Sequence, residues 1–148
     1  MFRGSSYHSI DPKGRIIIPA RFREAIRAGG DNAVMVSQLD GCLLSYPLDA
    51  WTDIEKRILA KTIKTESMRR FRRIFIGGAA YCACDKQERI LIPPPLRQYA
   101  ALEKDIVLVG VLDHFEIWSR DNWDKEHLTM EEDMRKEAVG DEIAELGL

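Results

Sequence analysis

Residues 11–19 read Asp-Pro-Lys-Gly-Arg-Ile-Ile-Ile-Pro, and residues 85–93 read Asp-Lys-Gln-Glu-Arg-Ile-Leu-Ile-Pro. The second stretch begins 74 residues after the first, and the Asp, the Arg, two Ile and the final Pro occupy the same columns. The correspondence continues downstream, since residues 33–36 resemble residues 106–109. A chain built from two similar units commonly folds around a pseudo-twofold axis and presents two similar surfaces.

The sequence of each unit predicts the same order of elements, namely strand, turn, strand, short helix and a hairpin of two strands. Residues 11–14 are typical of a turn, because Asp accepts backbone hydrogen bonds, Pro fixes φ and Gly tolerates positive φ. Pro19 is compatible with the start of a helix, and Gly29-Gly30 is typical of a helix end. In the first unit we expect strands at residues 7–10, 15–18, 34–36 and 42–44.

Further segments have helical periodicity. Residues 51–59 and 66–75 place apolar side chains at helical spacing, and Trp123 leads into a charged helical tail. No linker separates the units, so we expect their strands to interdigitate around one core. The expected fold class is α+β, mainly β. The expected divisions are a first half at 5–51, connecting helices at 52–75, a second half at 76–123 and an acidic helical tail at 124–148.

The composition is that of a soluble globular protein, with 45% hydrophobic and 31% charged residues. The apolar runs are too short for a membrane span and the N-terminus lacks a signal region, so we expect no membrane partner and a cytoplasmic location. Cys42, Cys82 and Cys84 lack metal-site spacing even with His114 added, and we interpret them as buried thiols. No nucleophile motif or phosphate-cradling loop is present, so we expect no enzyme, cofactor, metal or small-molecule substrate.

The charge is unevenly distributed along the chain. Net charge is −2, but residues 124–148 contain nine acidic and three basic side chains, whereas residues 1–123 contain 15 acidic and 19 basic ones. The sequence therefore predicts a basic body and an acidic tail.

Several motifs together resemble the MraZ family of bacterial regulators, which is similar in turn to the AbrB-like swapped-hairpin DNA-binding fold. They are the stretch at 11–19, its copy at 85–93, Met-Phe-Arg-Gly at 1–4, Arg-Phe-Arg-Arg-Ile-Phe at 70–75 and Phe-Glu-Ile-Trp at 115–118. A single Asp-x-x-x-Arg is a weak signal, but two of them, each leading into an Ile-x-Ile-Pro-like run at this separation, are a strong one. The resemblance covers about residues 1–123.

The resemblance implies a double-split β-barrel made of two swapped-hairpin halves in one chain. It also implies a ring-like homo-oligomer that binds double-stranded DNA in the nucleoid, at tandem direct repeats upstream of its own operon in the division and cell-wall gene cluster. By position in the motif, Arg15 and Arg89 are the base-reading candidates, and Asp11 and Asp85 are their orienting partners.

Elementary chemistry is consistent with those roles. The guanidinium of an arginine can donate two hydrogen bonds to guanine in the major groove, which discriminates against other bases by about 1–3 kcal/mol. A two-stranded β-ribbon is narrow enough to enter that groove. The alternative is a surface salt bridge across each turn, worth roughly 0–1 kcal/mol and without a partner.

Other basic residues have two interpretations each. Turn and phosphate contacts are expected of Lys13, Gly14, Arg3, Arg21, Arg23, Lys86 and Arg97, which otherwise form a solvated basic face. An oligomer interface is expected of Arg69, Arg70, Phe71, Arg72, Arg73 and Phe75, with a second DNA contact as the alternative.

The two copies are not equivalent, because Glu88 replaces the glycine found at Gly14. This replacement removes a residue that adopts positive φ easily and places an anion beside Arg89. We therefore expect the first turn to be the principal reader, while the second turn contributes less or reads a different position. The competing class is a protein-interaction or antitoxin-like scaffold ring, in which the acidic tail would bind the partner instead of keeping the assembly soluble.

Overall fold

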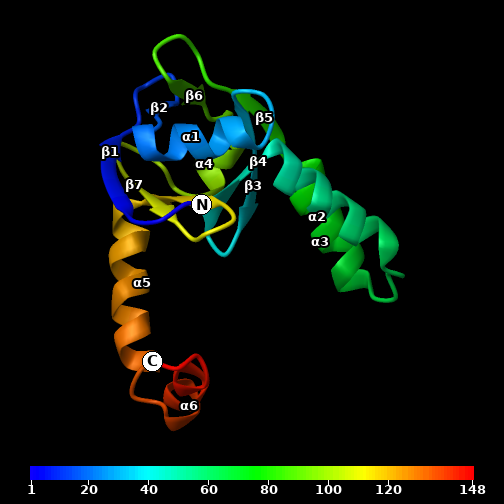
Figure 1. The fold of residues 1–148 in the computed structure, drawn as a ribbon, viewed down its shortest axis with the longest axis vertical. Coiled ribbons are helices and arrows are strands. Elements are labelled where there is room, and N and C mark those ends of the chain that lie inside the picture. Colours follow the sequence, from blue (N-terminus) through cyan, green and yellow to red (C-terminus); the bar gives the residue numbers. More distant parts are fainter.

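The computed structural model describes all 148 residues, which form eight strands and six helices (Figure 1). The strands are β1 Ser5–Ser9, β2 Arg15–Ile17, β3 Ala33–Leu39, β4 Cys42–Pro47, β5 Ala80–Ala83, β6 Arg89–Leu91, β7 Asp105–Gly110 and β8 Phe115–Ser119. The helices are α1 Ala20–Ala28, α2 Leu48–Ala60, α3 Glu66–Gly77, α4 Pro94–Tyr99, α5 Arg120–Asp133 and α6 Glu137–Glu145.

Six strands form one antiparallel sheet in the order β1-β7-β8-β4-β3-β5, and β2 pairs with β6 in a separate ribbon. The first strand of each unit joins the other unit, because β1 pairs with β7 and β5 pairs with β3. The prediction that the strands of the two units interdigitate is therefore confirmed.

The pairing does not close a barrel. Strands β1 and β5 are the two edges of the six-stranded sheet and do not pair with each other. The reason lies in the turns, since after each turn the chain leaves the sheet and β2 and β6 pair with each other instead. The mixed α+β architecture with an antiparallel sheet is as predicted, whereas the strands form an open sheet and a ribbon.

The main core lies between the six-stranded sheet and a cover made of the ribbon, α1 and α4. Ile16, Ile18, Ile90 and Ile92 point from the ribbon region into this core, and each is fully buried. Each such side chain stabilises the fold by about 1.5–3 kcal/mol relative to an exposed position. This burial fixes which face of the ribbon is left for solvent.

A second apolar cluster covers the other face of the sheet. It includes Trp51 of α2 and Phe75 of α3, packed on Leu44 and Tyr46. Strand β4 is consequently buried on both faces, which is why its sequence lacks polar alternation. Cys42 belongs to this cluster, and burial raises the pKa of its thiol far above the usual range.

The helices outside the core project in two directions. The α2–α3 hairpin extends from one side of the sheet, and α5 leads away from another side to α6 and the C-terminus (Figure 1). Helix α5 is held at its start, where the ring of Trp123 lies 5.8 Å from that of Trp118. Neither α5 nor α6 contributes a buried residue, and no helix combines the length and apolar character needed to cross a bilayer.

Candidate nucleic-acid interface

The outer face of the β2–β6 ribbon presents an arginine paired with an aliphatic side chain twice. In its antiparallel register Arg15 lies opposite Leu91, Ile16 opposite Ile90 and Ile17 opposite Arg89. Because side chains alternate along a strand, the central Ile pair faces the core and the flanking pairs face outward. The ribbon lies at the end of the molecule opposite to α5 and α6 (Figure 1).

The first turn holds Arg15 in a fixed direction through Asp11. One carboxylate oxygen of Asp11 accepts the backbone N–H groups of Lys13, at 3.0 Å, and Arg15, at 2.8 Å. The other oxygen accepts Nε of Arg15 at 2.5 Å, which leaves the two terminal nitrogens of the guanidinium without an intramolecular partner. These contacts, led by the backbone hydrogen bond from Arg15, lower the pKa of Asp11.

The second turn reproduces this arrangement with one difference. Asp85 accepts the backbone N–H groups of Gln87 and Arg89, each at 2.9 Å, and Nε of Arg89 at 2.9 Å. A terminal nitrogen of Arg89 also donates to the side-chain oxygen of Gln87 at 2.5 Å. The side chain of Arg89 is 24% exposed against 33% for Arg15, so the first turn presents the freer guanidinium.

Each turn is supported by the helix of the other unit. Gly14 has φ of 91°, and a Cβ there would lie 2.8 Å from the guanidinium of Arg97 and 2.9 Å from the carbonyl oxygen of Ile92. No side chain fits at this position without displacing Arg97 of α4. Arg97 therefore packs directly against the first turn.

Glu88 occupies the equivalent position in the second turn with φ of 61°, a conformation that costs a non-glycine residue energy. Its carboxylate lies 2.9 Å from Arg27 and 4.0 Å from Arg23, both on α1. Glu88 precedes Arg89 in the chain, but its carboxylate pairs with α1 of the first unit. Arg27 was missed, since nothing in the sequence links it to a residue 61 positions away.

The remaining predicted phosphate contacts fall into two groups. Lys13 and Lys86 are exposed on the turns themselves. Arg3 and Arg21 lie together, since Nε of Arg21 donates to the carbonyl oxygen of Arg3 at 3.2 Å. No hydrogen bond or ion pair joins these two residues to either turn.

Positive charge is concentrated where the two turns meet the helices. Residues 11–27 and 85–97 together contain eight basic and four acidic side chains. Three of those acids, Asp11, Asp85 and Glu88, are already paired with arginines. The surface around the ribbon is therefore suited to a polyanion.

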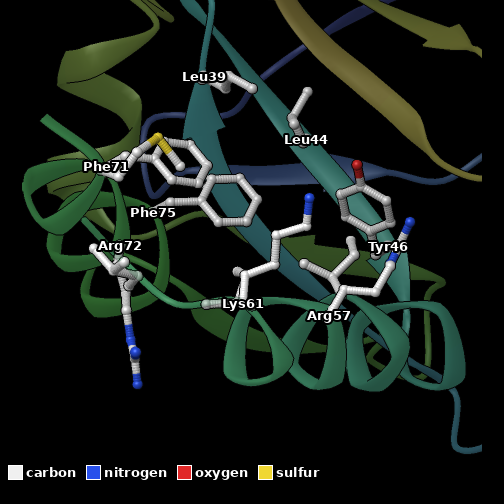
Figure 2. A pocket seen from close by; sticks show the side chains of 12 residues that line it. Leu39, Leu44, Tyr46, Arg57, Lys61, Phe71, Arg72 and Phe75 are labelled. Carbon is white, nitrogen blue, oxygen red and sulfur yellow. The ribbon is translucent and has the colours of Figure 1, made fainter. Parts of the chain in front are cut away.

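Arg72 of α3 borders an apolar groove that lies away from the ribbon. The groove, of about 460 Å³, is enclosed by α2, α3 and strands β3 and β4 (Figure 2). Phe71 and Phe75 line it and stack at 5.1 Å, and Phe75 is itself only 4% exposed. Phe75 thus supports the groove from within this chain. In Figure 2, Arg57 of α2 and Lys61, which directly follows α2, reach toward the groove.

Comparison with known proteins gives consistent matches. Residues 1–74 and 75–140 each match the family described as "MraZ protein, putative antitoxin-like". A protein of Desulforapulum autotrophicum named transcriptional regulator MraZ is 62% identical over the full length of both chains. Proteins with the same name from Desulfosudis oleivorans and Pelotomaculum thermopropionicum are 53% and 45% identical, over all of this chain and 100% and 99% of theirs.

Proposed function

The chain belongs to the MraZ family, and on that premise we propose that it is a sequence-specific DNA-binding regulator of transcription. Named relatives are transcriptional regulators and not enzymes, which supports a role in transcription. The observation that carries the DNA-binding part is the outer face of the β2–β6 ribbon, where two Asp-held arginines flank a pseudo-twofold axis.

The proposed mechanism places the outer face of the ribbon in the major groove. Arg15 and Arg89 donate to guanine O6 and N7, for about 1–3 kcal/mol of discrimination per good pair. Each Asp holds its arginine extended, so less conformational entropy is lost when the base contact forms. Lys13, Lys86 and Arg97 contribute phosphate contacts that position the protein and make binding salt-dependent.

We assign the larger share of base reading to the first turn. Arg15 keeps both terminal nitrogens free, whereas one of those of Arg89 is engaged by Gln87. In the second turn Glu88 also neutralises Arg23 and Arg27, which would otherwise be available to phosphates. Reading by the second turn is correspondingly weaker.

We propose that copies of the chain assemble head to tail into a ring, as heterologous contacts do when the rotation closes. The apolar groove is bordered by Arg57, Lys61 and Arg72, whereas the tail is acidic and exposes Leu128 and Met130. The groove and tail are complementary in charge. The α2–α3 hairpin, which lines the groove, and α5 extend from different sides of the molecule (Figure 1). Several readers in one assembly raise avidity for repeated sites.

The proposed target is a set of tandem direct repeats upstream of the chain's own operon. Binding there would regulate the division and cell-wall gene cluster. Repeats about 10 bp apart would place successive readers on one side of the duplex. The exchange of β1 and β5 between the units supports a swapped-hairpin relationship to AbrB-like proteins.

A fluorescence anisotropy titration tests the function. The full chain is titrated into the duplex upstream of its own gene and into a shuffled duplex of equal length and composition. We expect a preference of about 10³-fold or more for the upstream duplex, with affinity falling steeply between 50 and 200 mM salt. Equal, weak binding to both duplexes at low salt would instead favour the scaffold ring.

A further inference from the structure

Two exposed aliphatic side chains lie beside the arginines on the outer face of the ribbon. Ile17 is 54% exposed and Leu91 is 55% exposed, and they occupy the same column of the repeat. In the register Ile17 lies opposite Arg89, and Leu91 lies opposite Arg15. Single exposed aliphatic residues are ordinary on protein surfaces, but here one stands beside each arginine in both copies.

These side chains are not needed for the core. The neighbouring Ile16 and Ile90 are fully buried, so the alternation of each strand places Ile17 and Leu91 on the opposite face. Opposed side chains in an antiparallel pair have Cβ atoms about 4.5–5.5 Å apart. The outer face therefore carries two short rows, each with one guanidinium and one aliphatic group.

The charge around this patch identifies its partner. Two half-exposed aliphatic side chains fall far short of the roughly 1,200–2,000 Å² buried in a stable protein interface. They stand instead in a basic surface with two oriented arginines, which suits the edges of bases in a major groove. The apolar feature on those edges is the 5-methyl group of thymine.

We propose that Ile17 and Leu91 contact thymine 5-methyl groups next to the guanines read by Arg15 and Arg89. This inference rests on the proposed DNA-binding function and adds a second determinant of its specificity. Residues two apart in a strand are separated by about 6.6 Å, close to two base-pair steps of about 3.4 Å. The contacted thymines therefore lie within about two base pairs of the contacted guanines.

The experiment begins with selection of duplexes from a randomised library by the full-length wild-type chain. In the selected duplex, each thymine is then replaced singly by deoxyuridine, which lacks only the 5-methyl group. We expect one or two positions near the preferred guanines to lose about fourfold in affinity, the ratio that corresponds to one buried methylene-sized group. All other replacements are expected to leave affinity unchanged.

Variants then connect the methyl group to the side chain. Ile17→Ala and Leu91→Ala should each bind the thymine duplex about fourfold more weakly and no longer distinguish deoxyuridine at one position. Leu59→Ala removes the same type of side chain from an exposed site on α2 that does not line the groove, and it should retain the full distinction. Urea unfolding of Ile17→Ala and Leu91→Ala checks that any loss of affinity is not caused by loss of the fold.

The outcomes separate the two proposals. If no sequence is enriched in the selection, the proposed function itself fails. If a sequence is enriched and bound, but deoxyuridine replaces every thymine without loss of affinity, the methyl-contact inference alone is overturned. It is also overturned if Ile17→Ala and Leu91→Ala keep the wild-type distinction between thymine and deoxyuridine.

Discussion

The guanidinium of Arg15 is fixed in direction before any partner binds. Asp11 shares one oxygen between two backbone N–H groups and gives the other to Nε, so turn and side chain are tied to the same carboxylate. The terminal nitrogens then remain available as a planar fork. Lysine could replace the charge but has no fork and no Nε for Asp11 to hold.

The pairing of Glu88 predicts a measurable effect on DNA affinity. In Glu88→Gln the cations of Arg23 and Arg27 lose their anionic partner and become available to phosphates. We expect tighter binding at low salt and a plot of log affinity against log salt steeper by about 1 for each new phosphate contact. The control is Glu24→Gln. Glu24 is an exposed acidic residue on α1, the helix that carries Arg23 and Arg27, and it forms no ion pair. An unchanged slope in Glu88→Gln would show that the arginines of α1 do not face DNA.

The lowered pKa of Asp11 predicts a pH dependence of stability. A carboxyl with a lower pKa in the folded than in the unfolded state adds stability above its unfolded pKa of about 3.8, and this is lost as pH falls through the folded value. Asp11→Asn should therefore be less stable than the wild type at pH 7, and its stability should fall less between pH 5 and pH 2. Urea unfolding across this range measures the effect.

Glu55→Gln is the control for that series, because Glu55 is an exposed residue of α2 without an ion pair. The free energy of unfolding of Glu55→Gln should change with pH as that of the wild type does. Parallel curves for Asp11→Asn and the wild type would contradict the assigned role of the Asp11 hydrogen bonds.

At the scale of elements, the two faces of the ribbon should respond to mutation in opposite ways. Ile16→Ala removes a fully buried side chain and should lower the free energy of unfolding by about 2–5 kcal/mol. Ile17→Ala acts on the exposed face and should cost less than about 1 kcal/mol. Urea unfolding compares the two variants, and similar losses would mean that the assigned faces are wrong.

Much of the element order could be predicted from the sequence, because turn and helix-end residues act locally. The turns at 11–14 and 85–88, the helix that follows Pro19 and the helix near residues 66–75 all arise from such local signals. The Asp-to-Arg spacing likewise predicted the clamp in each turn. These features need only neighbouring residues to form.

Other features depend on contacts between distant residues and could not be foreseen. The pairing of Glu88 with Arg27 joins two units, and the burial of Phe75 depends on Trp51 of another helix, 5.3 Å away. The open sheet follows from the choice of β2 and β6 as partners for each other. The outward direction of Ile17 and Leu91 follows from the same pairing, since it decides which face of the ribbon covers the core.

At the scale of the whole molecule, the internal repeat gives a two-sided body with the proposed DNA-binding ribbon at one end and two projecting helical segments. We expect Met68→Glu, a change in the apolar groove, to dissociate the proposed ring, because a carboxylate there opposes apolar burial. Light scattering would show a smaller mass. Affinity for a duplex with several repeats should fall much more than affinity for a single site.

Ile74→Glu is the matched control for the groove. Ile74 is also on α3 and is 57% exposed against 52% for Met68, but it does not line the groove. This variant should keep the wild-type mass and avidity. If both variants have the wild-type mass, the groove is not the contact between copies.

The most direct test of the central claim compares the wild type and Arg15→Lys on the upstream duplex and on its shuffled counterpart at one salt concentration. Arg15→Lys keeps the charge but not the fork. We predict that its affinity for the shuffled duplex stays close to that of the wild type, while its preference for the upstream duplex falls by about 5- to 150-fold, as expected for one bidentate pair. An Arg15→Lys variant that keeps the full preference would contradict the assignment of Arg15 as a base reader.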